Sequence, residues 1–498
     1  MSDPVPLTDV RGGSHGLAVS YDRARALATS FDTAGNRMRG WAGTGERVLR
    51  NGDLLESALV SPLSFADAEL AVLGATIGPD GILVESVSWE TDALLIRSTV
   101  GAFERTDELV AATFEVVDYA VGRSIGFTIG AGLPVILPLA LVTGLVGYAG
   151  YSALPPHLQR EARAAAAAGG DAFQEWLADH PEVVEHLANG GGGLVDGFWA
   201  GATHQPFVGP DAAPLLHPTT EDAAGLLAAL YPSDGTPAVT ARTDLTPHGQ
   251  NPDGTPHSPG VPASLSEMLA HLRDVSLLSP DPDSSANGTI EVQTVHGPDG
   301  PRHLVYLPGT DDMLTTPASR DGDVRDLPTN FSAVSGVSTT YAEGILEAME
   351  LAGIAPGEPV TLVGHSQGGI MAGWLAAHQE TFAITNVVTA GSPVGDQGDY
   401  PAGTHVLSLE NRGDLIPLTE GEQNADAGNH VTVTFDASGT SIVGNHDLAR
   451  YVDGGGAVDA SDHPSLVAEL ERLRSLGFLG AGDEDTITQV FQVTRRPD

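Results

Sequence analysis

The chain has 498 residues, of which 41% are hydrophobic, so it can bury a sizeable core and is too apolar for a disordered protein. Its 65 acidic residues outnumber 23 cationic ones, all of them arginine, and the formal net charge of −42 argues against nucleic acid as a partner, because phosphates are bound by basic surfaces. The absence of cysteine excludes disulfides, thiolate nucleophiles and cysteine-ligated metals.

Residues 1–120 are predicted to form a helical region. Apolar residues recur at helical spacing over 17–28 and again over 94–114, and glycine and proline interrupt the pattern at 78–81. This spacing predicts three long amphipathic helices. Because no basic stretch followed by an apolar run opens the chain, a conventional secretory signal is not expected.

The second region, residues 121–156, contains the least polar stretch of the chain. Ser124–Pro156 is 33 residues long and carries no charge, whereas about 20 apolar residues suffice to span a bilayer. Pro134 and Pro138 predict a kink or a break into two shorter helices. Two interpretations follow from the composition: a membrane-associated segment, or a buried helical hairpin in a large soluble protein.

Residues 157–262 are predicted to form a helical connector followed by a linker. The helical pieces are Arg160–Ala168, Ala172–Leu187 and Glu221–Leu230. Residues 232–262 are rich in Pro, Gly, Thr and His, which is typical of a linker. Two histidines in this linker, His248 and His257, have no carboxylate at metal-like spacing, so we predict that both are solvated.

Residues 263–498 have a different pattern, in which strands alternate with helices. The predicted strands are Thr289–His296, Arg302–Leu307, Pro359–Val363, Ile384–Thr389, Thr404–Leu409 and His430–Phe435. The predicted helices are Leu265–Leu272, Tyr341–Leu351 and one that ends near His378. Strands joined by helical crossovers predict a parallel sheet covered on both faces, and thus an α/β fold.

The strongest motif is the pentapeptide Gly364-His365-Ser366-Gln367-Gly368, which lies between a predicted strand and a predicted helix. This is the context of a nucleophile elbow, a strand-to-helix turn so tight that glycine is needed on both sides of the serine. Such an elbow exposes the serine hydroxyl at the carboxyl edge of the sheet. The alternative is an ordinary glycine-rich turn.

A serine nucleophile needs an orienting acid and a base, which follow the serine along the chain in this architecture. His446 comes after the last predicted strand and is the candidate base, and the absence of lysine removes a Ser-Lys dyad. Asp414, which lies just past the strand Thr404–Leu409, is the candidate acid. Glu410 lies nearer to the end of that strand and is the competing candidate.

The oxyanion hole of such a site needs two backbone N–H donors. One would come from Gln367, the residue after the nucleophile. The other would come from the loop after Arg302–Leu307, where Thr310 is preferred to Asp311. The segments that could form a lid are residues 312–340 and 419–429.

Neither a cofactor nor a metal ion is expected from the sequence. A phosphate-cradling glycine loop that ends in lysine is excluded, because the chain has no lysine. Asp321, Asp323 and Asp326 form an acidic loop without the glycine that a calcium loop requires. We therefore predict that this loop is solvated.

Four motifs within residues 290–455, namely VYLPGT, LVGHSQGG, ENRGDLIP and NHDLARYV, resemble the lipase/esterase (class 3-like) branch of the α/β-hydrolase superfamily. The resemblance implies a serine hydrolase that cleaves carboxylic esters, with a lipid or phospholipid ester as substrate. It assigns Ser366 as the nucleophile, Asp414 as the orienting acid and His446 as the base. It also assigns Thr310 and Gln367 to the oxyanion hole.

The N-terminal region resembles the helical WxG/ESX-like substrates of type VII secretion. Trp41-Ala42-Gly43 stands as the WxG element, and Phe103–Asp107 resembles the Tyr-x-x-x-Asp export motif with Phe in place of Tyr. This resemblance implies an alternative function, in which the helices of an exported effector or envelope protein serve targeting or partner binding and the hydrolase domain is cargo or degenerate. Membrane association through Ser124–Pro156 or export by this route is the expected localisation, and the cytoplasm is the alternative.

Overall fold

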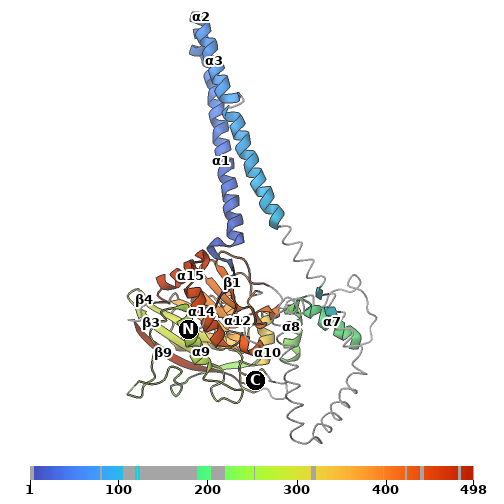
Figure 1. Ribbon diagram of the computed structural model, residues 1–498, viewed down its shortest axis with the longest axis vertical. Helices are drawn as coiled ribbons and strands as arrows, with labels where there is room; N and C mark the ends of the chain where they lie inside the picture. The colour runs from blue at the N-terminus through green and yellow to red at the C-terminus, as the bar shows by residue number, and fades with distance from the viewer. Residues whose placement is uncertain are drawn as a thin grey trace. The chain divides into compact units, whose positions relative to one another are not determined.

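The chain folds as two units, Leu17–Thr113 and the remainder, which comprises Met1–Gly16 and Phe114–Asp498 (Figure 1). The computed structural model describes residues 5–78, 81–104, 118–119, 122–123, 188–202, 219–251, 253–313, 315, 321–395, 397–420, 423–437, 442–480 and 484–496. The predicted apolar segment Ser124–Pro156 and the predicted helices Arg160–Ala168 and Ala172–Leu187 lie outside the described residues.

The larger unit is built on a nine-stranded sheet with the order β1-β8-β7-β6-β5-β4-β3-β9-β2. The strands are β1 Leu7–Gly12, β2 Thr236–Ala241, β3 Thr289–Gly297, β4 Gly300–Leu307, β5 Pro359–His365, β6 Ala383–Ala390, β7 His405–Asn411, β8 His430–Phe435 and β9 Asp485–Arg496. Neighbouring strands from β4 to β8 pair in parallel, and the outer pairs are antiparallel. The predicted α/β fold is confirmed, and the sheet is consistent with an α/β-hydrolase fold.

Helices cover both faces of this sheet (Figure 1). The helices of one face are α9 Leu265–Ser276, α14 Leu448–Asp459 and α15 Pro464–Ser475, and those of the other are α11 Thr340–Leu351 and α12 Gln367–His378. Successive strand residues point to opposite faces. In β4, Leu304 and Tyr306 pack beneath α9, whereas Val305 and Leu307 pack beneath α12, and all four are fully buried. The sheet is therefore the middle layer of three.

Three strands, β1, β2 and β9, were not predicted from the sequence. β1 lies in the region predicted as helical and pairs with β8, and β2 lies in the predicted linker and pairs with β9. These two strands form the edges of the sheet and are only partly buried, so their sequences lack the continuous apolar run of a central strand. The pairing that makes them strands comes from residues far away in sequence.

The predicted linker also contains a histidine that is not solvated. The side chain of His248 is only 6% exposed and its Nε2 lies 3.1 Å from a carboxylate oxygen of Glu291. His257 is exposed, as predicted. The prediction for His248 is wrong because its acidic partner stands on β3, which no local spacing in the sequence brings near the linker.

In the helical unit, the described residues form α1 Leu17–Leu49, α2 Gly52–Val60, α3 Pro62–Ile77 and a further helix over 82–104. The three long helices that the sequence predicted are present, and a short helix that was not predicted, α2, lies between the first two of them. Asn51 caps α2 by accepting a hydrogen bond from the N–H of Asp53 at 2.9 Å, and Pro62 begins α3. α3 ends at Ile77, and Gly78 and Gly81 are not helical, as the predicted interruption requires.

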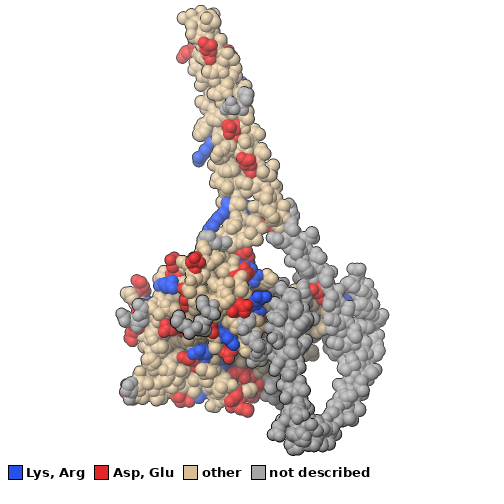
Figure 2. Space-filling view, in the orientation of Figure 1, with Lys and Arg blue, Asp and Glu red and all other residues tan. Residues whose placement is uncertain are grey.

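The helical unit exposes large apolar side chains. Leu59, Val60 and Leu63, which lie in and beside the short turn between α2 and α3, are 89%, 87% and 83% exposed. Figure 2 shows long stretches of uncharged surface on the visible face of these helices. Within the described residues, Pro62–Glu104 is long and apolar enough to cross a membrane, by length and composition only.

The residues of the secretion resemblance lie on these helices. Trp41-Ala42-Gly43 lies inside α1, which continues to Leu49, and Trp41 is 59% exposed. Phe103 lies near the end of the helix over 82–104 and is 57% exposed, whereas Asp107 is outside the described residues. The export route therefore stays a prediction from the sequence.

Candidate active site

Ser366 is the single residue between strand β5 and helix α12. Its backbone has φ 53° and ψ −124°, and it is the one non-glycine residue with a positive φ in the described part of the chain. Strained residues of this kind persist where the surrounding structure holds them, commonly at functional sites. The geometry is that of a nucleophile elbow, with Ser366 at the carboxyl edge of the sheet.

The glycines on either side of Ser366 are required by close backbone approach. A Cβ added to Gly364 would lie 2.4 Å from the carbonyl oxygen of Gly368, and one added to Gly368 would lie 1.9 Å from the carbonyl oxygen of Leu307. Both distances are far below van der Waals contact. The elbow therefore packs directly against the end of β4, which carries the candidate oxyanion loop.

The candidate acid and base contact each other. Nδ1 of His446 donates to Oδ2 of Asp414 at 2.6 Å, and the Asp414 side chain is fully buried. The hydroxyl of Tyr451 donates to the same oxygen, and the N–H of Ile416 donates to Oδ1 at 3.0 Å. Because Nδ1 of His446 carries the donated proton, Nε2 of the neutral ring is left as the proton acceptor.

The hydroxyl of Tyr451 remains a donor across the working pH range. Its burial, together with the neighbouring Asp414 carboxylate, raises the pKa of Tyr451 well above its usual range. A protonated phenol next to a carboxylate gives a charge-assisted hydrogen bond, which is stronger than one between neutral groups. The sequence placed Tyr451 in the NHDLARYV motif, five residues after His446, but assigned it no role.

Glu410 has different partners. Its Oε1 accepts a hydrogen bond from Nδ2 of Asn424 at 2.8 Å, and its Oε2 lies 3.9 Å from the guanidinium of Arg11. The acid that contacts His446 is therefore Asp414. Glu410 lies near the end of β7 and Asp414 in the loop that follows it, so the contacts of the two side chains distinguish the candidates.

Two buried asparagines join the loops that carry Asp414 and His446. Nδ2 of Asn445 donates to the carbonyl of Gly413 at 2.8 Å, and Nδ2 of Asn411 donates to the carbonyl of Asn445 at 2.9 Å. Asn445 is adjacent in sequence to His446, and Asn411 is close in sequence to Asp414. These bonds fix the positions of Asp414 and His446 relative to each other. Neither asparagine was predicted from the sequence to support the site.

His365 lies beside the candidate base. Its Nε2 donates to the backbone carbonyl of His446 at 2.9 Å, and the two ring centroids are 4.5 Å apart. Burial, together with the charge that His446 can carry, lowers the pKa of His365 well below its usual range. His365 is thus neutral at working pH and serves as a hydrogen-bond donor to the loop of His446.

The candidate oxyanion donors lie on the two elements that meet at the elbow. Gln367 is the first residue of α12, so its N–H has no intrahelical acceptor. In the loop after β4, the N–H of Asp311 donates to the carbonyl of Arg325 at 3.0 Å and is therefore engaged. This contact favours Thr310 over Asp311 as the second donor.

Asn330, which the sequence analysis missed, connects these two positions. Nδ2 of Asn330 donates to Oγ1 of Thr310 at 3.0 Å, and Oδ1 of Asn330 accepts from Nε2 of Gln367 at 2.9 Å. Asn330 stands on α10 Leu327–Val334, within the predicted lid segment 312–340. The described part of that segment is therefore bonded to the candidate oxyanion residues.

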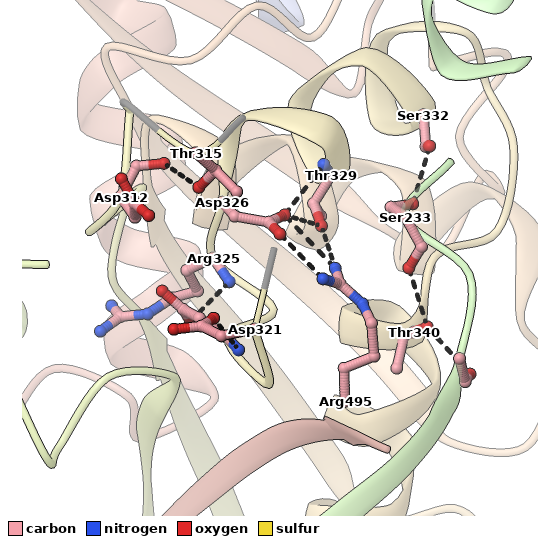
Figure 3. A network of polar contacts seen from close by, with 12 residues as sticks. Ser233, Asp312, Thr315, Asp321, Arg325, Asp326, Thr329, Ser332, Thr340 and Arg495 are labelled. Carbon is pink, nitrogen blue, oxygen red and sulfur yellow. Dashed lines mark hydrogen bonds and ion pairs between the residues drawn. The ribbon is translucent and has the colours of Figure 1, made fainter. Parts of the chain in front are cut away.

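A buried ionic network lies behind the oxyanion loop (Figure 3). Figure 3 shows the carboxylate of Asp326 facing the guanidinium of Arg495, with Thr329 beside them, and Nη1 of Arg495 lies 2.8 Å from Oδ2 of Asp326. Arg325 pairs with Asp311 at 2.5 Å, and both side chains are almost fully buried. The prediction that the loop of Asp321, Asp323 and Asp326 is solvated is wrong for the last two, which are buried. Asp326 pairs with Arg495, which is distant in sequence, and Oδ1 of Asp323 accepts the backbone N–H of Arg325 at 3.0 Å.

Asp323 gives this network a dependence on pH. Burial, with the neighbouring Asp311 carboxylate, raises the pKa of Asp323 to about 8. The folded protein therefore keeps a proton that the unfolded chain releases near its ordinary pKa of about 4. Because the folded state binds more protons between these values, its free energy of unfolding falls as the pH rises from about 4 to about 8.

We expect Asp323→Asn to flatten this pH dependence, because an amide takes up no proton over this range of pH. Urea unfolding between about pH 5 and about pH 8.5 measures the effect as the difference in the slope of unfolding free energy against pH. Asp321→Asn is the matched control, since Asp321 is exposed on the same loop. A slope that is equal in the wild type and in Asp323→Asn would contradict the assignment.

Comparison with known proteins gives one family match, over part of the sheet. Residues 334–408 match the family model described as "Alpha/beta hydrolase". The matched stretch contains β5, the elbow with Ser366, α12 and β6, and it ends in β7 before Asp414 and His446. The comparisons with curated proteins and with solved structures found no significant match. The matched stretch and the sheet support a hydrolase of the α/β-hydrolase superfamily.

Proposed function

We propose that the protein is a serine hydrolase that cleaves carboxylic esters with Ser366 as nucleophile, His446 as base and Asp414 as orienting acid. The observation that carries the proposal is the 2.6 Å contact between Nδ1 of His446 and the buried Asp414 carboxylate. This pair and the strained Ser366 come from the carboxyl ends of parallel strands, which meet at one edge of the sheet.

In the proposed reaction, Nε2 of His446 takes the hydroxyl proton of Ser366 while Oγ attacks the ester carbonyl carbon. The N–H groups of Gln367 and Thr310 bind the oxyanion, and Asp414 stabilises the imidazolium. Collapse of the tetrahedral intermediate expels the alcohol, which takes the proton from His446. Water, deprotonated by His446, then attacks the acyl-enzyme, which releases the acid and restores Ser366.

We propose a lipid ester as the substrate. Two apolar features support this proposal. The side chains of Leu59, Val60 and Leu63 are exposed, and the sequence Ser124–Pro156 carries no charge. The net charge of −42 gives no Coulomb attraction to anionic lipid, so contact with lipid has to be apolar.

A fluorophosphonate probe tests the proposal, because it forms a covalent adduct with an activated serine. We expect one adduct per chain in intact-mass spectra. We expect no adduct when the protein is denatured, or inhibited with phenylmethylsulfonyl fluoride, before the probe is added. The same preparation is expected to hydrolyse p-nitrophenyl butyrate and p-nitrophenyl palmitate, with the longer ester preferred at a lipid interface. A folded protein that neither forms the adduct nor cleaves either ester would refute the proposed function.

We also propose, as a second function, that the helical unit binds a membrane surface. The exposed apolar residues at the turn between α2 and α3 favour this role, as does the stretch Pro62–Glu104. We expect the full chain to float with phosphatidylcholine vesicles in a sucrose gradient, and Leu59→Glu with Leu63→Glu to float several-fold less. Ser57→Glu, a change on α2 at a polar position, is the control. Wild-type protein that stays wholly at the bottom of the gradient would refute membrane binding.

A further inference from the structure

Three side chains from distant parts of the chain meet in the core beneath α9. His271 stands on α9, Glu291 on β3, and His248 on the segment that follows β2. Nε2 of His271 lies 2.6 Å from Oε1 of Glu291, and Nε2 of His248 lies 3.1 Å from Oε2 and 3.3 Å from Oε1. The three ligand atoms lie within 4.8 Å of one another.

These distances suit a tetrahedral metal ion. With zinc bonded to nitrogen and oxygen at about 2.0–2.1 Å, neighbouring ligand atoms of a tetrahedron are about 3.3 Å apart. The two contacts of His248 already have this spacing, and the contact of His271 would lengthen by a fraction of an ångström. Two imidazoles and one carboxylate are a ligand set that zinc accepts, whereas magnesium and calcium prefer oxygen alone.

The contacts that His248 and His271 make on the side away from Glu291 also fit a bound metal ion. Nδ1 of His248, the nitrogen that points away from Glu291, lies 3.6 Å from Oδ2 of Asp274. A histidine that binds a metal usually donates its other ring N–H to such a carboxylate. The ring of His271 stacks on Tyr306 with centroids 4.1 Å apart and planes 12° from parallel, which holds its Nε2 toward Glu291.

The cluster is closed to solvent. The Glu291 side chain is 0% exposed, and those of His271 and His248 are 5% and 6% exposed. A buried carboxylate is costly unless cationic or hydrogen-bonding groups compensate its charge. A divalent ion would supply that compensation and would join three segments that are otherwise separate in sequence.

We propose that His248, His271 and Glu291 bind a structural zinc ion, with water as the fourth ligand. The ion ties the segment after β2 to α9 and β3. The site shares no residue with the proposed triad, so the two proposals fail independently. Because the cluster is closed, the role is structural, and the ion takes no part in ester cleavage.

Zinc stoichiometry tests this site in the full chain, purified without a histidine tag. The protein is stripped with EDTA, loaded with excess zinc chloride, desalted and analysed by inductively coupled plasma mass spectrometry. We expect about one zinc per chain in the wild type and at least about five-fold less in His248→Gln and in Glu291→Gln. Both variants keep hydrogen-bonding side chains of similar size, and circular dichroism with size-exclusion chromatography checks their fold.

His257→Gln is the matched control, because His257 is an exposed histidine of the same segment. It is expected to bind zinc as the wild type does. Cobalt loading provides a second readout, since four-coordinate cobalt gives visible absorption bands that six-coordinate cobalt in water lacks. Wild-type protein without bound zinc, or folded His248→Gln and Glu291→Gln variants with wild-type zinc content, would overturn the proposal.

Discussion

Ser366→Ala is expected to abolish the fluorophosphonate adduct and to lower kcat for p-nitrophenyl butyrate by a factor on the order of 10⁶, the size of effect seen when a triad serine is removed. The physical reason is that alanine offers no oxygen for the acyl-enzyme, so only transition-state binding by the oxyanion donors remains. Intact-mass spectrometry and steady-state kinetics measure the two effects.

Ser335→Ala is a suitable control for this result. Ser335 lies at the end of α10, and its hydroxyl donates only to the carbonyl of Ser332 on the same helix at 2.8 Å among the described contacts. We expect the control to be labelled and to retain kcat within about two-fold, as is usual for a surface change away from a site. Labelling of Ser366→Ala at the wild-type level would show that another serine reacts.

Asp414→Asn is expected to lower kcat by a factor on the order of 10⁴, with a small effect on KM. The amide cannot hold Nδ1 of His446 as a donor with the same strength, and it does not stabilise the imidazolium that forms when Ser366 loses its proton. The hydrogen bonds from Tyr451 and Ile416 fix the position of the side chain at residue 414. The loss of kcat therefore comes from the missing negative charge and from the changed tautomer of His446. Steady-state kinetics over a range of ester concentrations separates kcat from KM.

Glu410→Gln is the control that distinguishes the two acids. Glu410 contacts Asn424 and Arg11, and its replacement is expected to change kcat by no more than a few-fold. The opposite ranking, with Glu410→Gln the more damaged variant, would transfer the orienting role to Glu410. Equal losses in both variants would mean that neither carboxylate orients the base alone.

The candidate nucleophile could be predicted because its signal is local. A strand, a glycine-flanked serine and a helix lie within about twenty residues, and the tight turn between the two elements permits few other residues. The structure has this turn, and Gly364 and Gly368 lie where a side chain would clash. The order of acid and base after the serine is also a property of the chain and could be stated from the sequence.

The edge strands and the supporting contacts could not be predicted in this way. Strands β1 and β2 have short, mixed sequences, and each becomes a strand because one neighbour pairs with it. Asn330, Asn411 and Asn445 carry no motif, yet their amides join loops that are far apart in sequence. Such contacts depend on which segments the fold brings together.

The sequence by itself determined that the chain is acidic and free of cysteine, that its second half alternates strands with helices, and that Ser366 occupies an elbow. These are consequences of composition and of periodicity within one element. Only the tertiary structure decided that Asp414, and not Glu410, contacts His446, and that His248 lies buried against Glu291. Contacts of this kind join residues on separate loops and strands, and no local pattern encodes the distance between them.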